Sequence, residues 1–336
     1  METLVCNGPG ELALVERSPI ERGAGEVLVK PRRVGICGTD YHIYEGKHPY
    51  LAYPRVMGHE LAVEVVDPGT SDFVAGEVLV VNPYLSCGTC IACRRGKPNC
   101  CTKIAVLGVH RDGGMTGLLS LPPQNLLHAE GLSMDACAAV EFLAIGAHAV
   151  ARTGIATGER VLVIGAGPIG LGVALFATLS GGVVTVMDRD EGRLAAARDL
   201  FAIAGTIVAS EGAEAAVAAL TGGDGFDVVL DATGNPASIE KGFDFVAHGG
   251  RYTLVSVVKS DIKFADGDFH RKEMTVIGSR NALSPDFARV IAAMRNGQVP
   301  VERLITHRTN MAAAVQDLPR WAQDKSGLIK AVIELD

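Results

Sequence analysis

Short apolar segments separated by glycine and proline run through the first part of the chain. Glu26–Val29, Leu61–Val66 and Val78–Val81 are rich in the β-branched and aliphatic residues that strands favour. Turn-forming residues punctuate these segments. The pattern predicts a β-rich region from residue 1 to about residue 140.

From about residue 146 the pattern changes to apolar strands that alternate with helical segments. Helices are expected from Pro168 and near Glu191–Phe201. Six segments have the pattern of strands: Val161–Gly165, Val183–Met187, Thr206–Val208, Asp227–Asp231, Arg251–Val255 and Thr275–Ile277. Because strands that alternate with helices form parallel sheets, this region predicts an α/β fold with a doubly wound sheet of six parallel strands.

The last part of the chain, from about residue 280, contains an expected helix at Pro285–Asn296 and an expected strand at Leu328–Leu335. This tail either forms a third unit or returns to the first domain. A length of 336 residues is enough for two domains with cores of their own.

The composition and charge of the chain argue against some classes of function. The chain is 48% apolar and 21% charged, with a net charge of −7, which argues against a nucleic-acid or anionic-membrane surface. Apolar stretches are broken by glycine or charge before the roughly 18 residues that a membrane span needs. The N-terminus lacks the basic, apolar pattern of a secretion signal. We therefore expect a cytoplasmic protein, in which the eight cysteines are free or bind metal.

Four cysteines stand at spacings of three, three and eight residues: Cys87, Cys90, Cys93 and Cys101. Short loops at these spacings can bring four thiolates around one tetrahedral zinc ion. Four thiolates leave the ion no open position, so the site is expected to be structural. The alternative is a set of buried or disulfide-paired cysteines. Cys100 is a second candidate for the fourth ligand, and the eight-residue spacing favours Cys101.

A glycine-rich turn follows the first strand of the α/β region and opens a helix. It reads Gly165-Ala166-Gly167-Pro168-Ile169-Gly170, the G-x-G-x-x-G pattern that lets a backbone approach a pyrophosphate at a helix N-terminus. Asp188 ends the next strand, where a carboxylate accepts hydrogen bonds from ribose hydroxyls and repels a 2′-phosphate. This predicts NAD as the cofactor. The neighbouring Arg189 keeps NADP open, and a glycine turn without a ligand is the structural alternative.

A second set of metal-binding residue types lies apart from the four cysteines. Cys37 stands in Gly-Ile-Cys-Gly-Thr-Asp, His59 and Glu60 in Gly-His-Glu, and Glu141 in Glu-Phe-Leu-Ala. Each has a structural alternative: a buried thiol, a core histidine with satisfied hydrogen bonds, or a charge on a helix surface.

Taken in order, these motifs resemble the zinc-dependent medium-chain dehydrogenase family, and the resemblance covers essentially the whole chain. It implies a β-rich GroES-like catalytic domain at residues 1–145, a Rossmann NAD-binding domain at 146–279, and a return of residues 280–336 to the catalytic domain. The active site is then expected between the domains. The family is mostly dimeric or tetrameric, so a homodimer or homotetramer is expected.

The resemblance also implies roles for individual residues. Cys37, His59 and Glu141 would hold a catalytic zinc, with Glu60 behind them or bound to the ion intermittently. Asp40 would orient His59. Thr39 and His42 match positions that relay the substrate proton, and Arg193 joins the cofactor site. The chain would thus hold two zinc ions, one catalytic and one structural, and one NAD.

The substrate is suggested by weaker motifs. Residues 93–100, 106–114 and 278–282 are most similar to the bacterial sugar-acid branch, which includes L-galactonate and L-gulonate 5-dehydrogenases. Arg280 would grip a hydroxyl or carboxylate of such a substrate. Alternatives are an L-threonine 3-dehydrogenase and a sorbitol-type polyol dehydrogenase. From another class comes a non-catalytic NAD-binding protein, although its zinc ligands would be broken and here they are present.

Overall fold

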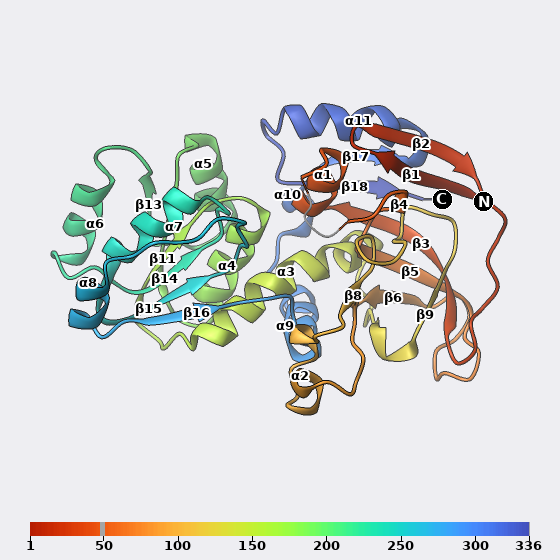
Figure 1. Ribbon diagram of the computed structural model, residues 1–336, viewed down its shortest axis with the longest axis horizontal. Helices are drawn as coiled ribbons and strands as arrows, with labels where there is room; N and C mark the ends of the chain where they lie inside the picture. Colours follow the sequence, from red (N-terminus) through yellow and green to blue (C-terminus); the bar gives the residue numbers. More distant parts are fainter. Residues whose placement is uncertain (48–50, 336) are drawn as a thin grey trace. The chain divides into compact units, whose positions relative to one another are not determined.

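The computed structural model describes residues 1–47 and 51–335, and the chain forms two compact units (Figure 1). The first unit comprises Met1–Glu141 and Leu283–Asp336, and the second comprises Phe142–Ala282. The boundary at residue 141 falls inside one long helix, α3 (Met134–Thr153).

The first unit is built mainly from β-sheet. Its largest sheet has the strand order β10-β6-β5-β3-β18-β17, and β9 also pairs with β3. The strands are β10 (Leu126–His128), β6 (Val78–Val81), β5 (Glu60–Asp67), β3 (Val27–Ile36), β18 (Lys330–Glu334), β17 (Ile305–Asn310) and β9 (Leu119–Leu121). Two smaller sheets contain β2 (Glu11–Glu16), β1 (Glu2–Gly8) and β4 (Arg55–Val56), and the pair β7 (Tyr84–Leu85) and β8 (Ala105–Val106).

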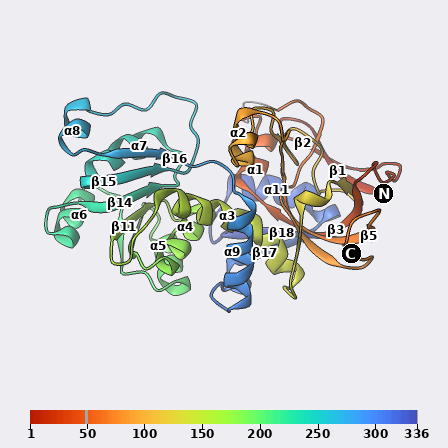
Figure 2. The same cartoon turned by 90° about the horizontal axis from the view of Figure 1, so that it is seen from below.

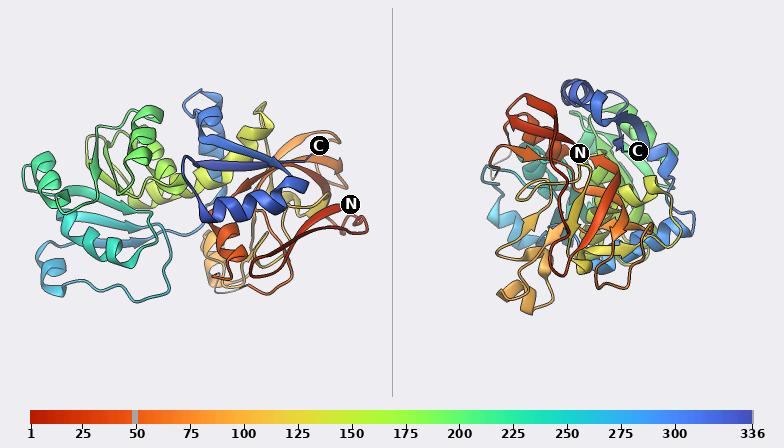
Figure 3. Two further views of the ribbon diagram at one scale, coloured as in Figure 1. Left: turned by 90° about the horizontal axis from the view of Figure 1, so that it is seen from above. Right: turned by 90° about the vertical axis from the view of Figure 1, so that its right-hand side faces the viewer.

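The C-terminal tail completes this sheet. Strand β18 pairs antiparallel with β3, which places Ala331 opposite Ile36, and β17 pairs parallel with β18. Figure 3 shows the blue C-terminal strands beside the red and orange strands of the N-terminal part. Of the two arrangements left open by the sequence, the tail therefore joins the first unit. The buried apolar side chains of both segments form one core, with Leu4, Met57, Leu107, Met115, Trp321 and Ile333 among its members.

Short helices and turns connect the strands of the first unit. These are α1 (Gly38–Tyr44), α2 (Ile91–Arg94), α9 (Ser284–Arg295), α10 (Val301–Leu304), α11 (Met311–Gln323) and the 3₁₀ turns η1 (Pro98–Cys100) and η2 (Pro123–Asn125). Helix α11 was not expected from the sequence, nor was the half-exposed strand β17. Helix α9 was expected and begins within one residue of the expected start.

The second unit is a parallel sheet covered by helices on both faces. Its six strands have the order β13-β12-β11-β14-β15-β16, and every pairing is parallel. They are β13 (Gly205–Val208), β12 (Val183–Asp188), β11 (Arg160–Ile164), β14 (Phe226–Asp231), β15 (Val246–Leu254) and β16 (Thr275–Gly278). The prediction of a six-stranded doubly wound sheet is confirmed.

The helices of this unit follow the strands in alternation. They are α4 (Pro168–Leu179), α5 (Glu191–Leu200), α6 (Ala213–Thr221), α7 (Pro236–Gly242) with the turn η3 (Phe243–Phe245), and α8 (Asp266–Arg271). Helices α4 and α5 lie on one face of the sheet, with α7 on the other (Figure 2). The connecting helices change from one face of the sheet to the other around β11 and β14, and this change makes the sheet doubly wound.

Two strands extend beyond their expected ends because each contains an irregularity. Strand β3 continues through Pro31 to Ile36, and its pairing with β5 shifts register next to that proline. Strand β15 starts at Val246, five residues before the expected start at Arg251, and passes through Gly249 with φ +73°. Glycine and proline inside a strand mark bulges as well as ends, so the sequence pattern alone placed the ends too early or too late.

Helix α3 is long and apolar enough, by length and composition, to cross a membrane. However, 78% of its most apolar window is buried inside the protein, and core helices of this kind pass the same test. Its middle carries the buried Glu141. A Cβ on Gly146 would stand 2.5 Å from the backbone of Gly172, so α3 and α4 pack at close range in the second unit.

The turn before α4 gives a first testable prediction. A Cβ on Gly170 would lie 1.7 Å from the carbonyl oxygen of Gly165, whereas one on Gly167 would meet nothing within 4 Å. Gly170→Ala should therefore force the turn apart and destabilise the protein by about 1–3 kcal/mol or more. Thermal unfolding followed by circular dichroism should show a Tm several degrees below that of the wild type.

Gly167→Ala is the matched control in the same turn. Its Tm should stay within about 2 °C of the wild-type value, because surface changes without a clash usually cost under 0.5 kcal/mol. Equal Tm values for the two variants would contradict the close packing of this turn.

Candidate active site and metal centres

A single buried carboxylate connects the two segments that carry Cys37 and His59. Cys37 precedes helix α1, and its N–H donates to Asp40 Oδ2 over 2.8 Å. The other oxygen, Oδ1, accepts from the N–H of Gly58 at 3.3 Å. Asp40 is fully buried, and burial raises the pKa of its carboxyl. The carboxylate thus fixes the start of α1 against the turn that leads into His59.

Three potential metal ligands meet beside this carboxylate. The Cys37 sulfur, a ring nitrogen of His59 and a carboxylate oxygen of Glu60 all lie within 4.8 Å of one another. Nδ1 of His59 is buried without a hydrogen-bond partner among the described residues and lies 3.9 Å from Asp40 Oδ1. Thiolate, imidazole and carboxylate are the donor types that zinc prefers, so these residues fit such an ion.

Electrostatics reinforce this grouping. Burial alone would lower the pKa of the His59 imidazole, but the negative charges of Asp40 and Cys37 outweigh it and raise that pKa well above its usual value. The cluster therefore attracts positive charge, a property that suits a cation site.

Glu60 has a buried partner of its own. Lys330 on β18 donates from Nζ to both oxygens of Glu60 at 2.7 Å and to the carbonyl of Ile36 at 3.2 Å. The exposed fractions of these side chains are 2% for Lys330 and zero for Glu60. Burial would lower the pKa of Lys330, but Glu60 and Cys37 raise it. Gly35 leaves room for this pair, because a Cβ there would lie 2.2 Å from Glu60 Oε2.

Glu141, the expected third ligand, is not a member of the group of Cys37, His59 and Glu60. It is buried in helix α3, and its Oε1 accepts a short hydrogen bond from the hydroxyl of Tyr84. Burial raises the pKa of the Glu141 carboxyl to about 7, while the charge of His59 and the bond from Tyr84 act in the opposite direction. The same burial, together with Glu141, raises the pKa of the Tyr84 phenol well above its usual value, which keeps it a neutral donor.

The remaining residues of the expected active site lie in two places. Thr39 is half-buried, and its Oγ1 lies 3.8 Å from the Cys37 sulfur. His42 is exposed on the same helix, α1. Arg280 is exposed in the second unit, just after strand β16.

The four spaced cysteines come together in one loop. Ligand sulfurs of Cys87, Cys90, Cys93 and Cys101 all lie within 4.8 Å of one another, whereas Cys100 is exposed and is not part of this group. The N–H groups of Cys87 and Lys103 both point at the Cys101 sulfur, each at 3.3 Å. Backbone N–H groups of Cys93 and Thr102 lower the pKa of the Cys90 thiol to about 5. Burial and the neighbouring thiols act the other way on Cys93 and raise its pKa to about 11. The four sulfur donors, at these distances, fit a tetrahedral zinc site.

The glycine-rich turn in the second unit has the geometry of a phosphate-binding loop. Gly165 has φ +98°, and Gly167 is the N-cap of helix α4, with Pro168 at its first position. Asp188 at the end of β12 accepts from the N–H of Ala166 at 2.6 Å, so the turn and the carboxylate hold each other in place. The helix N-terminus with its free N–H groups is suited to an anion.

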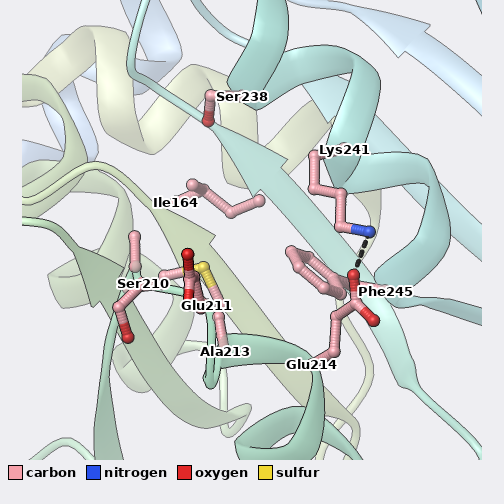
Figure 4. A pocket seen from close by; sticks show the side chains of 10 residues that line it. Ile164, Ser210, Glu211, Ala213, Glu214, Ser238, Lys241 and Phe245 are labelled. Atoms are coloured by element: carbon pink, nitrogen blue, oxygen red, sulfur yellow. Dashed lines mark ion pairs between the residues drawn. The ribbon is translucent and has the colours of Figure 1, made fainter.

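A pocket of about 370 Å³ lies beside this turn, at the carboxyl ends of β11 and β12. Figure 4 shows apolar side chains such as Ile164 and Phe245 on its walls, and Lys241 paired with Glu214 at one side. The lining residues are Ile164, Met187, Ala209, Ser210, Glu211, Ala213, Glu214, Ser238, Lys241 and Phe245. Arg193 lies on α5, with Nε 4.0 Å from Asp190, and does not line the pocket. Its volume lies in the range of small-molecule sites, and its lining mixes apolar and polar side chains.

Sequence reasoning missed Tyr84, Lys330 and the pocket residues. Tyr84 stands three positions before Cys87, but a lone tyrosine carries no spacing signal. Lys330 opens a strand whose three central residues are apolar, and a lysine at the end of a strand is ordinarily expected at the surface. The pocket is lined from several strands and helices, so its residues share no local motif.

Comparisons with known proteins agree with this architecture. The family model described as "Alcohol dehydrogenase GroES-like domain" matches residues 23–131, and that described as "Zinc-binding dehydrogenase" matches residues 168–296. L-galactonate-5-dehydrogenase of Escherichia coli K12 is 41% identical over 335 residues, which cover 99% of this chain and 98% of that protein. L-threonine 3-dehydrogenase of Bacillus licheniformis is 33% identical over 314 residues, 90% of each chain.

A solved structure extends the likeness to three dimensions. The crystal structure of the short chain alcohol dehydrogenase RspB from E. coli CFT073, complexed with NADH, superposes with a TM-score of 0.92 and 29% identity. The match covers 100% of this chain and 99% of that one. The chain belongs to the zinc-dependent medium-chain alcohol dehydrogenase family and is an oxidoreductase with a GroES-like unit and a Rossmann unit.

Proposed function

We propose that this protein is a zinc- and NAD-dependent dehydrogenase that oxidises a secondary alcohol of a sugar acid, with L-galactonate and L-gulonate as the first candidates. The observation that carries the proposal is the cluster of Cys37, His59 and Glu60 in the first unit of a chain of this family, with His59 and Glu60 buried. The buried Nδ1 of His59 has no hydrogen-bond partner among the described residues, and a purely structural histidine would ordinarily have one.

Cys37, His59 and Glu141 are the proposed ligands of the catalytic zinc, with Glu60 as a second carboxylate close by. Glu60 already balances the charge of the buried Lys330, so using it as the permanent ligand would weaken that pair. Glu141 carries no such buried cation as a hydrogen-bond partner among the described residues and accepts from a neutral phenol. A bound zinc would supply a Lewis acid for the substrate hydroxyl, and NAD would accept the hydride.

The chain itself would move the substrate proton. Thr39 lies beside the Cys37 sulfur, within reach of a hydroxyl bound next to that ligand. His42 stands on the same helix and is exposed, so it can exchange a proton with water. Thr39 and His42 would therefore form the route by which the alcohol proton reaches solvent.

NAD is the proposed cofactor of the second unit. The turn at Gly165–Gly170 would take the pyrophosphate at the N-terminus of α4, and Asp188 would take the adenosine ribose. The pocket beside Ile164 and Met187 would take the adenine. Arg189 is exposed next to Asp188, which makes NADP the weaker alternative.

The choice of a sugar acid rests on similarity and on one side chain. The 41% identical relative is named for L-galactonate, and Arg280 offers a planar fork of donors suited to a carboxylate. L-threonine and polyols such as sorbitol are the alternatives, since a threonine dehydrogenase is also among the relatives. We further propose a cytoplasmic homodimer or homotetramer that acts on small molecules.

Removing a proposed ligand of the catalytic zinc should stop turnover without removing the cofactor site. Cys37→Ser or His59→Ala should lower kcat/KM by about 10³-fold or more, because a Lewis acid contributes several kcal/mol to the barrier. NADH affinity, measured by fluorescence titration, should stay within about threefold of the wild-type value. Cys100→Ser, a change at an exposed cysteine outside both groups, is the control and should keep full activity. A loss of NADH affinity equal to the loss of rate would count against these roles.

Removing a thiol from the four-cysteine loop should act differently. Cys90→Ser should reduce soluble yield and Tm more than it reduces the activity of the folded fraction, because a closed structural site contributes folding free energy. Zinc content per chain, measured by atomic absorption, should fall by about one. A stable variant with full zinc content would show that Cys90 is not a zinc ligand.

A small substrate panel tests the proposed reaction. Zinc-loaded protein is mixed with L-galactonate, L-gulonate, L-idonate, galactitol, sorbitol or L-threonine, each with NAD and with NADP. The formation of NADH or NADPH is followed at about 340 nm, where the reduced nicotinamide absorbs. We expect turnover of one aldonate with NAD, lost on chelation. Turnover of threonine or a neutral polyol alone would overturn the sugar-acid proposal, and silence across the panel in zinc-loaded protein that binds NADH would do the same.

A further inference from the structure

Tyr84 occupies a place in the first unit that neither the sequence motifs nor the expected active site explains. Its hydroxyl donates to Oε1 of Glu141, and both side chains are buried, at 7% and 4% exposure. A buried carboxylate can accept from several donors at once, so one oxygen can be held while the other stays available. The bond therefore selects one orientation of the Glu141 side chain.

The backbone of Tyr84 is fixed on both sides. Its N–H donates to Asn82 Oδ1 at 3.1 Å, and its carbonyl accepts from Asn125 Nδ2 at 3.3 Å. In the pair formed by β7 and β8, Tyr84 lies opposite Val106. This pair closes the base of the loop that carries the four cysteines, from Cys87 to Cys101.

The ring of Tyr84 is fixed as well. It meets the buried ring of Phe287 edge-on, at 6.4 Å between centroids and 71° between planes. With backbone and ring both fixed, the hydroxyl has little freedom, so it can impose its position on the more flexible glutamate. Residues that orient a metal ligand in this way commonly change metal affinity 10–100-fold when they are altered.

We propose that Tyr84 is a positioning residue: its hydroxyl holds one carboxylate oxygen of Glu141 so that the other is presented to a metal ion beside Cys37 and His59. This inference rests on the proposed function, because it takes Glu141 as a zinc ligand. It assigns no proton transfer to Tyr84 and no contact with substrate. Its consequence is that removal of one hydroxyl should weaken the catalytic metal site while the fold stays intact.

Tyr84→Phe keeps the ring contact with Phe287 and removes only the hydroxyl. We expect the affinity for Zn²⁺ of the weaker of the two metal sites, measured by competition with a chelator, to fall by about 10–100-fold. With Co²⁺ in place of Zn²⁺, the visible absorption bands of that site should shift, because the carboxylate ligand changes orientation. The four-cysteine site should keep its affinity.

Tyr252→Phe is the matched control. Tyr252 is fully buried in the second unit, and its hydroxyl donates to a single acceptor, the carbonyl of Ile239, at 2.9 Å. This variant loses a buried phenol hydroxyl as well, but it should leave both metal affinities and the cobalt spectrum unchanged. A similar loss of metal affinity in both variants would show a general effect of destabilisation and overturn the assignment.

A double-mutant cycle separates positioning from packing. In a Glu141→Ala background, Tyr84→Phe should change Zn²⁺ affinity by less than about twofold, because the side chain that it positions is gone. Independent, additive losses would overturn the proposal.

The metal content of the wild-type protein and of Cys37→Ser separates a failure of the proposed catalytic zinc site from a failure of the proposed role of Tyr84. If wild type holds metal at the four cysteines only, or if Cys37→Ser removes no metal, the proposed catalytic site fails and this inference with it. If wild type holds both metals and Tyr84→Phe keeps its zinc affinity and cobalt spectrum, only the role of Tyr84 fails.

Discussion

The ion pair between Lys330 and Glu60 is the interaction on which the first unit depends. The two side chains are 270 residues apart in sequence and almost fully buried. Leaving either charge alone in such a place costs several kcal/mol, about 3–5 in comparable cases, so each residue requires the other. The pair thereby links the C-terminal strand β18 to β5 across the strand between them, β3, and so favours the place of the tail with the N-terminal part and not with the segment that precedes it.

Around this pair, each acidic group of the candidate metal centre has its own support. Asp40 accepts from two backbone N–H groups, Glu60 from a lysine, and Glu141 from a tyrosine. Each support comes from a different segment: α1 and the turn at Gly58, strand β18, and strand β7. The donors are therefore held by the framework of the unit, which is how a site stays open for metal and substrate without relaxing onto itself.

Much of the architecture could be predicted because its signals are local. The turn at Gly165–Gly170 needs glycine for close approach, and its spacing marks both strand β11 and helix α4. The parallel sheet follows from apolar strands of regular spacing. In contrast, α3 is apolar on most of its surface, so it lacks the periodic pattern by which a half-exposed helix is recognised. In strand β17 every residue after Ile305 is polar, and exposed positions alternate with buried or half-buried ones, so it resembles a loop in sequence.

The sequence predicted the residues of the candidate site but not the hydrogen bonds and ion pairs that hold them. Cysteine, histidine and glutamate at these spacings indicate a metal site. No sequence pattern predicts that Glu60 pairs with Lys330 or Glu141 with Tyr84, because these residues lie in segments that only the fold brings together.

The charges of these side chains also determine which ion the site can bind. Four groups that are anionic when ionised lie in this buried cluster, against one lysine and one histidine: Cys37, Asp40, Glu60 and Glu141. Burying such an excess of negative charge is unfavourable unless a cation offsets it. Burial raises the pKa values of Asp40 and Glu141, and the negative charges of Asp40 and Cys37 raise that of His59. A divalent cation would offset this excess of negative charge, so the charge balance of the cluster favours the same kind of ion that its donor types select.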